Sequence, residues 1–199
     1  RSLRKGGEPV EPLYTTEDVE KVLPLVDRTK YGQVVDTGKG VRYGFFDAGH
    51  ILGSGSLALW LNANEKEKKI IFSGDIGRKG NPIINDPTLA TEADYVVMES
   101  TYGDRLHKNN ADTANELVEA VTTTFGSGGN VLIPAFAIGR TQDVLYLLNR
   151  LVREKKLPKL TVTIDSPLAK KATTIYLRHP DLYDDEAVRL LRGGRIGDA

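Results

Sequence analysis

The order of strand-like and helix-like segments constrains the fold of this chain more than any other feature of its sequence. Four segments in the first half are rich in apolar, β-branched and aromatic residues and are separated by glycines or polar residues, as is typical of β-strands. They cover residues 31–38, 41–48, 56–63 and 68–75. The charged residues 64–69 are expected to form a solvated hairpin tip. The first half therefore predicts successive, mainly antiparallel strands.

The second half predicts an alternation of helices and strands. Apolar residues recur at helical spacing in two long segments, whereas short apolar runs predict strands that are buried on both faces. The expected helices cover residues 111–125, 139–156, 167–178 and 184–194, and the expected strands cover 93–100, 130–136 and 159–165. Ser166 and Pro167 are a favourable N-cap and first residue for a helix. We therefore predict an α/β fold, with a change of texture near residues 100–110.

The start of the chain predicts a polar loop and one short helix. Thr15 and Asp18 have the spacing of a capping box, with Asp in place of the usual Glu. Pro24 lies inside the helical pattern that follows and should shorten or kink the helix, because proline removes a backbone hydrogen bond.

Composition excludes several classes of function. The 199 residues include 27 Lys+Arg and 27 Asp+Glu, so bulk charge does not predict nucleic-acid binding. The absence of cysteine excludes a disulfide scaffold, a thiolate metal site and a cysteine nucleophile. The longest apolar run, at residues 131–138, is far too short to span a membrane, and no secretory signal is recognisable. We therefore expect a cytoplasmic protein with no membrane partner.

Three polar residues follow predicted strands and are candidates for chemistry. They are His50, Asp75 and Glu99. Functional groups often gather beyond strand ends, and imidazole nitrogen and carboxylate oxygen both suit zinc. Each residue also has an ordinary structural interpretation, as a loop histidine, a turn aspartate and a strand-end glutamate. The set favours a metal-dependent hydrolase without excluding those interpretations.

Five segments that contain or follow these residues resemble one known family. They are "DAGHILGSGS" from Asp47, "IIFSGDIGR" from Ile70, "DYVVMESTYGDR" from Asp94, "GGNVLIPAFAIGRTQDVLYLL" from Gly128 and "IDSPLAKKATTIY" from Ile164. In this order they resemble the metallo-β-lactamase-fold nucleases of the β-CASP family, and within it the prokaryotic members of the RNA-processing branch. The resemblance extends from about Pro12 to Ala187.

The resemblance implies a role for each candidate residue. His50 would be a ligand of one zinc ion, and Asp75 would bridge two zinc ions. Glu99 would be a catalytic residue that orients a histidine rather than a ligand of the metal. Arg140 and Ser166 would contact RNA phosphates or shape the substrate cleft, although both also suit a purely structural role at a helix start.

The resemblance is incomplete in one informative respect. The motif His-x-His-x-Asp-His, which should precede His50, does not occur in this sequence, nor do the later histidine motifs. His107 and His179 match no ligand motif and are expected at the surface. Because the chain begins with Arg1 and its only methionine is Met98, we expect an internal fragment of a larger protein.

The expected fragment has two parts. Residues 1–104 would be the C-terminal part of a metallo-β-lactamase αββα sandwich, and residues 105–199 would be the N-terminal part of a β-CASP domain. With only two ligands, it should bind little zinc and cleave little RNA. Uncovered sheet edges would favour a homodimer.

The sequence therefore predicts part of a zinc-dependent ribonuclease. A catalytically dead β-CASP homologue that binds RNA or serves as a scaffold is an alternative, as is a DNA-directed nuclease of the same family. A small-molecule metallo-hydrolase is a further alternative, but segment 128–142 argues against it, because the small-molecule members lack a β-CASP insertion.

Overall fold

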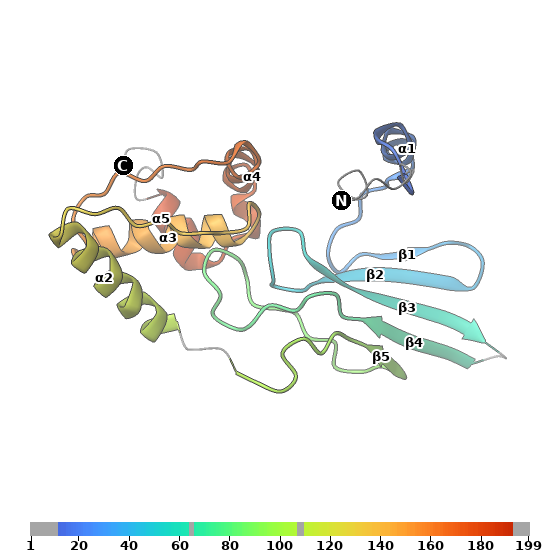
Figure 1. The fold of residues 1–199 in the computed structure, drawn as a ribbon. Helices are drawn as coiled ribbons and strands as arrows, with labels where there is room; N and C mark the ends of the chain where they lie inside the picture. Colours follow the sequence, from blue (N-terminus) through green and yellow to red (C-terminus); the bar gives the residue numbers. More distant parts are fainter. Residues whose placement is uncertain (1–11, 64–65, 107–109, 193–199) are drawn as a thin grey trace. The chain divides into compact units, whose positions relative to one another are not determined.

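The computed structural model of the chain describes residues 12–63, 66–106 and 110–192 (Figure 1). The contacts divide the chain into two units, with the division between Lys30 and Tyr31. We describe each unit by itself. The expected domain boundary between residues 104 and 105 is a different division and stays a prediction.

The first unit contains the short helix α1, Thr16–Val22, followed by the 3₁₀-turn η2, Leu23–Leu25. The predicted capping box is present, because Asp18 accepts a hydrogen bond from the Thr15 backbone N–H at 2.9 Å. Pro24 occupies the start of the 3₁₀-turn, so the α-helix ends before it, as the sequence predicts.

A five-stranded mixed sheet forms the first part of the second unit. Its strands are β1 (Val34–Asp36), β2 (Val41–Asp47), β3 (Gly55–Ala63), β4 (Lys66–Phe72) and β5 (Tyr95–Val97), in the order β1-β2-β3-β4-β5. Neighbouring strands are antiparallel except for β4 and β5, which pair in parallel from Ile70↔Tyr95 to Phe72↔Val97. The four strands predicted at residues 31–75 are confirmed. Residues 64–65 of the predicted hairpin tip lie outside the described residues, and residues 66–69 were predicted wrongly as part of the tip, because they pair with β3 and begin β4.

The directions of these strands place three chain segments at one end of the sheet. Strand β3 is antiparallel to both β2 and β4, so β2 and β4 run in the same direction. Strand β5 is parallel to β4 and therefore ends at the same side. The residues that follow β2, β4 and β5 consequently leave the sheet at a common end.

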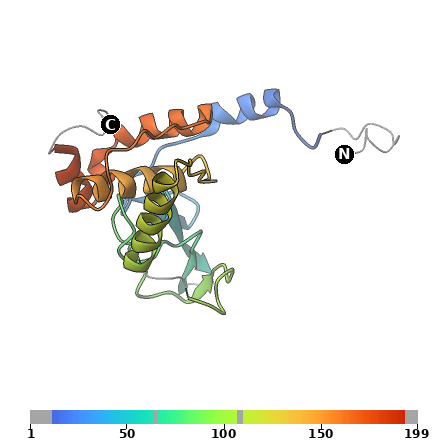
Figure 2. The same ribbon diagram turned by 60° about the vertical axis from the view of Figure 1, so that its left-hand side comes forward.

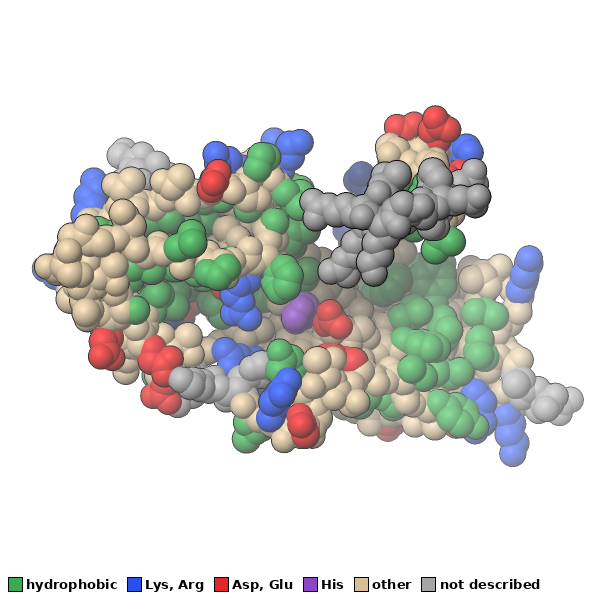
Figure 3. All heavy atoms as spheres, viewed as in Figure 1, with side chains coloured by type: hydrophobic (Ala, Val, Ile, Leu, Met, Phe, Trp, Pro, Cys, Tyr) green, Lys and Arg blue, Asp and Glu red, His purple; other side chains and the backbone are tan. Residues whose placement is uncertain are grey.

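Burial of the fifth strand was predicted wrongly. Tyr95, Val96 and Val97 are 58%, 59% and 54% exposed. Strand β5 is at the edge of the sheet, so only β4 provides it with backbone partners. Hydrophobic side chains gather over the strands on the face seen in Figure 3. Val34 of β1 and Phe72 of β4 are also exposed, at 48% and 38%.

Four helices make up most of the remainder of this unit, and their order follows the sequence prediction. They are α2 (Asn110–Gly126), α3 (Arg140–Arg153), α4 (Pro167–Leu177) and α5 (Asp185–Arg192), with the 3₁₀-turn η3 (Pro180–Leu182) before α5. In Figures 1 and 2, α3 runs next to α4 and α5.

Helix α3 contributes to two apolar clusters. One cluster joins α2 to α3 and to the residues after α3; it contains Ala114, Val121, Leu148, Leu151, Leu157 and Leu160. The other joins α3 to α4, to α5 and to the loop that follows β4; it contains Ile83, Ile84, Tyr146, Tyr176, Tyr183 and Ala187. Leu52, from the loop after β2, packs against this second cluster. The two faces of α3 thus organise the helical part.

The strands predicted at residues 130–136 and 159–165 are not formed. In the described part of the chain, neither segment has the backbone partners that define a strand. Leu132 and Phe136 are 92% and 83% exposed, so the first segment is not buried either. A strand depends on a neighbour for its hydrogen bonds, and an apolar run cannot supply one.

No helix within the described ranges is both long and apolar enough to span a membrane.

Candidate metal centre and its surroundings

A tight loop after β2 presents His50. The Ser54 hydroxyl accepts hydrogen bonds from the backbone N–H groups of His50 and Ile51, at 3.0 and 3.2 Å. The Ser54 N–H donates to the Ile51 carbonyl at 3.0 Å, and the Ala48 N–H donates to the Ser54 carbonyl at 3.1 Å. Gly49 has a φ of 61°, a left-handed conformation that glycine adopts without strain. The sequence "GHILGS" therefore folds into a closed loop because its serine bonds back to its own backbone.

A second loop, after β4, carries Asp75 and is locked to the first. The Gly77 N–H donates to the Ala48 carbonyl at 2.8 Å. The two backbones approach so closely that a Cβ atom on Gly77 would lie 1.6 Å from the Gly49 carbonyl oxygen. Only glycine fits at position 77, so the spacing of the loops is set by backbone contact.

This arrangement brings two of the predicted metal ligands together. His50 Nε2 lies 3.9 Å from Asp75 Oδ2. The side chains are 44% and 70% exposed, so both are accessible from solvent. Zn–N and Zn–O bonds measure about 2.0–2.2 Å, so two atoms that share one zinc ion lie within about 4 Å of each other. The pair therefore has a spacing that one ion can bridge.

Glu99 leaves the sheet at the same end but does not join this pair. It is two residues beyond the end of β5, and its side chain is exposed. Within residues 12–63, 66–106 and 110–192, no group of three His, Cys, Asp or Glu residues could hold a metal ion. Glu99 therefore lies beyond the same end of the sheet as His50 and Asp75, and its role stays a prediction.

The donor chemistry and spacing of His50 and Asp75 fit zinc, but their number does not complete a site. Structural zinc sites have four protein ligands, and catalytic sites commonly have three plus water. The described residues provide one face of a zinc site, and further ligands would be required for tight binding.

The start of helix α3 lies against the His50 loop. A Cβ atom on Gly139 would meet Ile51 Cγ2 at 2.6 Å, which shows how closely these segments pack. Arg140 follows as the first residue of α3, with its side chain 66% exposed and its Nη1 3.8 Å from Asp143 Oδ2. Arg140 is therefore accessible near the His50 loop, where a cation could attract an anion.

Asp143 is a titratable group that the sequence analysis did not select. Burial raises the pKa of its carboxyl from 3.8 to about 6, while the positive charges of Arg140, His50 and Arg78 partly oppose that rise in pKa. These partners come from α3 and from both loops, so Asp143 lies where the three segments meet. An acidic residue in the first turn of a helix is usually explained by the helix dipole, which is why sequence alone did not distinguish it.

Ser166 is occupied as a helix cap. Its hydroxyl accepts a hydrogen bond from the Ala169 N–H at 3.2 Å, as predicted for the start of α4. Tyr176, which contacts the His50 loop, is ten residues further along this helix. At 1.5 Å per residue, the two positions are about 15 Å apart. The structure thus supports the capping role of Ser166 and does not bring it to His50.

The other two histidines contribute nothing to this centre. His179 is exposed and precedes the 3₁₀-turn η3, in agreement with the prediction of a surface residue. His107 lies outside the described residues.

Arg78 was also missed by the sequence analysis. It follows Gly77 in the second loop, and its Nε donates to Asn81 Oδ1 at 3.2 Å. Its guanidinium also bonds to Asn110 Oδ1, at the first residue of α2. The segment "SGDIGR" therefore connects the Asp75 loop to the helical part. No pattern in the sequence identifies Asn110 as its partner.

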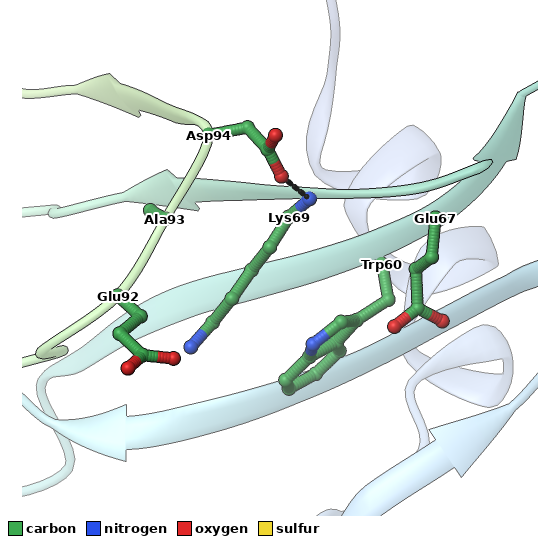
Figure 4. Close-up of a pocket in the computed structure, with 6 residues that line it drawn as sticks. All are labelled: Trp60, Glu67, Lys69, Glu92, Ala93 and Asp94. Carbon is green, nitrogen blue, oxygen red and sulfur yellow. Dashed lines mark hydrogen bonds between the residues drawn. The ribbon is translucent and has the colours of Figure 1, made fainter.

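A separate hollow lies on the sheet around Trp60 (Figure 4). Its volume is about 440 Å³, and it is lined by Trp60, Glu67, Lys69, Glu92, Ala93 and Asp94. Arg42 and Lys69, which flank Trp60 on the neighbouring strands, lie 5.7 and 5.6 Å from the centre of its ring system. Arg42, Trp60 and Lys69 thus form a row of interacting side chains across three strands. Three of the lining residues are acidic and one is basic, but Glu67 and Asp94 are ion-paired with Arg42 and Lys68.

Comparison with known proteins identifies the family. Residues 141–195 match the Beta-Casp domain. Ribonuclease TTHA0252 of Thermus thermophilus is 34% identical over 176 residues, which cover 88% of this chain and 39% of that protein. An RNase J-like protein of Methanocaldococcus jannaschii is 32% identical over 169 residues, or 83% of this chain and 39% of that protein. Residues 141–195 therefore belong to a β-CASP domain, and the chain is homologous to β-CASP ribonucleases.

A eukaryotic relative extends the same similarity. Endoribonuclease YSH1 of Eremothecium gossypii is 26% identical over 192 residues, which cover 94% of this chain and 24% of that protein. The aligned region spans about two fifths of the length of the two prokaryotic relatives and a smaller share of this one. Similarity therefore includes both the strand-rich and the helical parts of the chain but leaves most of each relative unmatched.

Proposed function

We propose that this chain contributes His50 and Asp75 to the metal centre of a zinc-dependent ribonuclease that hydrolyses RNA phosphodiester bonds in the cytoplasm. The observation that carries the proposal is the 3.9 Å approach of His50 Nε2 to Asp75 Oδ2, in two loops that backbone contacts lock together. Two of the relatives are named as ribonucleases, which supports RNA as the substrate.

The proposal assigns a role to each remaining site residue. Arg140, exposed next to the His50 loop, would attract a phosphate. Glu99 would orient a histidine that the described residues do not supply, and Ser166 would shape the cleft from the start of α4. Two bound zinc ions would supply an activated water and charge stabilisation at the phosphate. Further ligands would come from outside this chain, with the strand-rich part belonging to a metallo-β-lactamase sandwich and the helical part to a β-CASP domain.

The test compares matched histidine variants in the ribonuclease that contains this sequence. Cleavage of 5′-labelled single-stranded RNA is measured with zinc present and after chelation, for the wild type, His50→Ala, Asp75→Asn and His179→Ala. We expect the first two variants to lose at least about 100-fold in rate and His179→Ala, whose side chain is exposed, to retain activity. Equal activity of His50→Ala and wild type contradicts the proposal.

The same assay separates the alternatives. A DNA oligonucleotide of identical sequence tests for a DNA-directed nuclease, which would cleave it in preference to RNA. A non-catalytic RNA-binding subunit, which the lack of a third described donor leaves as the second candidate, would retain RNA without cutting it. For the 199-residue chain alone we expect weak zinc binding and little cleavage. Tight, stoichiometric zinc binding by that chain would contradict this part of the proposal.

A further inference from the structure

The His50 loop has one hydrogen bond to the helical part of the described chain. The Leu52 N–H donates to the Tyr176 hydroxyl oxygen at 3.2 Å, across 124 residues of sequence. The loop's other described hydrogen bonds are internal or involve residues of the strand-rich part, such as Tyr31, whose hydroxyl donates to the Ser54 carbonyl at 2.8 Å. Tyr176 is therefore the point at which helix α4 holds this loop.

Tyr176 is itself firmly held. Its side chain is 6% exposed and lies in the cluster with Ile83, Ile84 and Tyr183. The Leu52 side chain packs against the same cluster, so side chain and backbone of this residue are both anchored there. The ordinary pKa of a tyrosine hydroxyl is about 10 and burial raises that of Tyr176 further, so the hydroxyl is neutral near pH 7. A buried, neutral hydroxyl on a packed ring is a fixed acceptor for the Leu52 N–H.

The loop needs such an anchor because of its composition. Gly49 and Gly53 flank His50 and Leu52, and their φ values of 61° and 84° are conformations that glycine can leave at little cost. The bonds to Ser54 close the loop but do not fix its orientation relative to helix α4. A contact two residues after His50 restricts the directions in which the imidazole can point.

We propose that Tyr176 is a positioning residue, whose hydroxyl fixes the backbone at Leu52 and thereby holds the His50 imidazole toward Asp75. The inference rests on the proposed function for its consequence, which is metal affinity. The structural effect, which is the order of the His50 loop, does not depend on the proposed function. The two parts can therefore be tested separately.

The experiment uses the 199-residue chain with Tyr176→Phe, which removes the hydroxyl and keeps the ring in its cluster. Loss of one hydrogen bond should raise the exchange rate of the Leu52 amide proton by about three- to tenfold in hydrogen exchange followed by NMR. Zn²⁺ is then titrated while the imidazole signal of His50 is followed. We expect the apparent dissociation constant at His50 to increase by about three- to tenfold.

Tyr183→Phe is the matched control. Tyr183 is 8% exposed in the same cluster, and the hydrogen bond from the Leu52 N–H goes to the hydroxyl of Tyr176 rather than to that of Tyr183. It should leave both the Leu52 exchange rate and the zinc titration of His50 within twofold of the wild type. Comparable changes in the two variants would show a general loss of packing and overturn the proposal, as would an unchanged Leu52 exchange rate in Tyr176→Phe.

The outcomes also distinguish this inference from the proposed function. If Leu52 exchanges faster in Tyr176→Phe and zinc binds at His50 more weakly in this variant than in the wild type, both hold. If Leu52 exchanges faster but zinc leaves His50 unaffected in all variants, the positioning role stands and the metal assignment of His50 fails. A zinc response at His50 that is identical in Tyr176→Phe and wild type overturns the positioning role and leaves the metal assignment intact.

Discussion

Apolar runs fold differently in the strand-rich part of this chain, which contains β1 to β5, and in the helical part, which contains α2 to α5. In the first, the apolar segments at β2, β3 and β4 pair along seven-residue registers and form a sheet. In the second, the similar runs at residues 130–136 and 159–165 remain without strand partners in the described chain, while the helices around them are complete. A helix satisfies its backbone within one segment, whereas a strand requires another.

The comparison predicts that stability of the helical part depends on the helix core. Leu151 is 1% exposed and belongs to the cluster that joins α2 to α3. Leu151→Ala should lower the free energy of unfolding by about 3–4 kcal/mol through lost burial and a cavity. Urea unfolding followed by circular dichroism measures this change. A loss below about 1 kcal/mol would show that the cluster is loosely packed and that the stability of the helical part does not depend on it.

In the strand-rich part, we expect the largest loss in the free energy of unfolding at a backbone contact rather than at a core side chain. Gly77→Ala places a Cβ atom against the Gly49 carbonyl oxygen and must separate the two loops. The expected loss is about 3 kcal/mol, again measured in urea, together with loss of the His50 response to zinc. Gly126→Ala, at the end of α2 with no atom within 4 Å of the new Cβ, is the matched control and should be neutral or slightly stabilising. Equal effects of both substitutions would refute the close approach.

Asp143, where α3 meets the two loops, predicts a pH effect. Its pKa in the folded chain is about 6, above the ordinary 3.8, so the folded state binds more protons in this interval. The contribution of Asp143 to stability should therefore be largest below about pH 4 and fall as the pH rises through 6. Asp143→Asn should remove this decline and gain about 1 kcal/mol at pH 7, once solvent screening of the partly exposed carboxyl is allowed for. Thermal unfolding measures this effect, and the same pH dependence in wild type and Asp143→Asn would contradict the raised pKa of Asp143.

The smallest effect is expected in the unpaired segment. Leu132 is 92% exposed, so Leu132→Ser should change the free energy of unfolding by less than about 0.5 kcal/mol. The expected homodimer rests on uncovered sheet edges rather than on this segment, so size-exclusion chromatography should show the same amount of dimer for this variant as for the wild type. A loss of several kcal/mol in the monomer would mean that the segment is buried and that the two parts differ less than described.

Local sequence was sufficient to predict most elements. The capping box at Thr15, the cap at Ser166 and the strands between residues 31 and 75 each depend on neighbours close in the chain or on successive hairpins. The placement of His50 and Asp75 at one end of the sheet followed from strand ends. Their contact, however, depends on Gly49 meeting Gly77 across 28 residues, and the charge environment of Asp143 depends on segments further away. Such contacts have no local signature, because they are set by how completed elements pack.

The bond between Leu52 and Tyr176 has a consequence for the order of folding. Strands β2, β3 and β4 are joined by short connections and can pair early, since closing a short loop costs little entropy. The Leu52 amide can form its hydrogen bond only when Tyr176, which lies 124 residues later in the chain, is in place. During synthesis, the His50 loop therefore emerges well before its anchor on α4. We expect the sheet to form first and the metal-binding loop to reach its final conformation last, when the helical part docks.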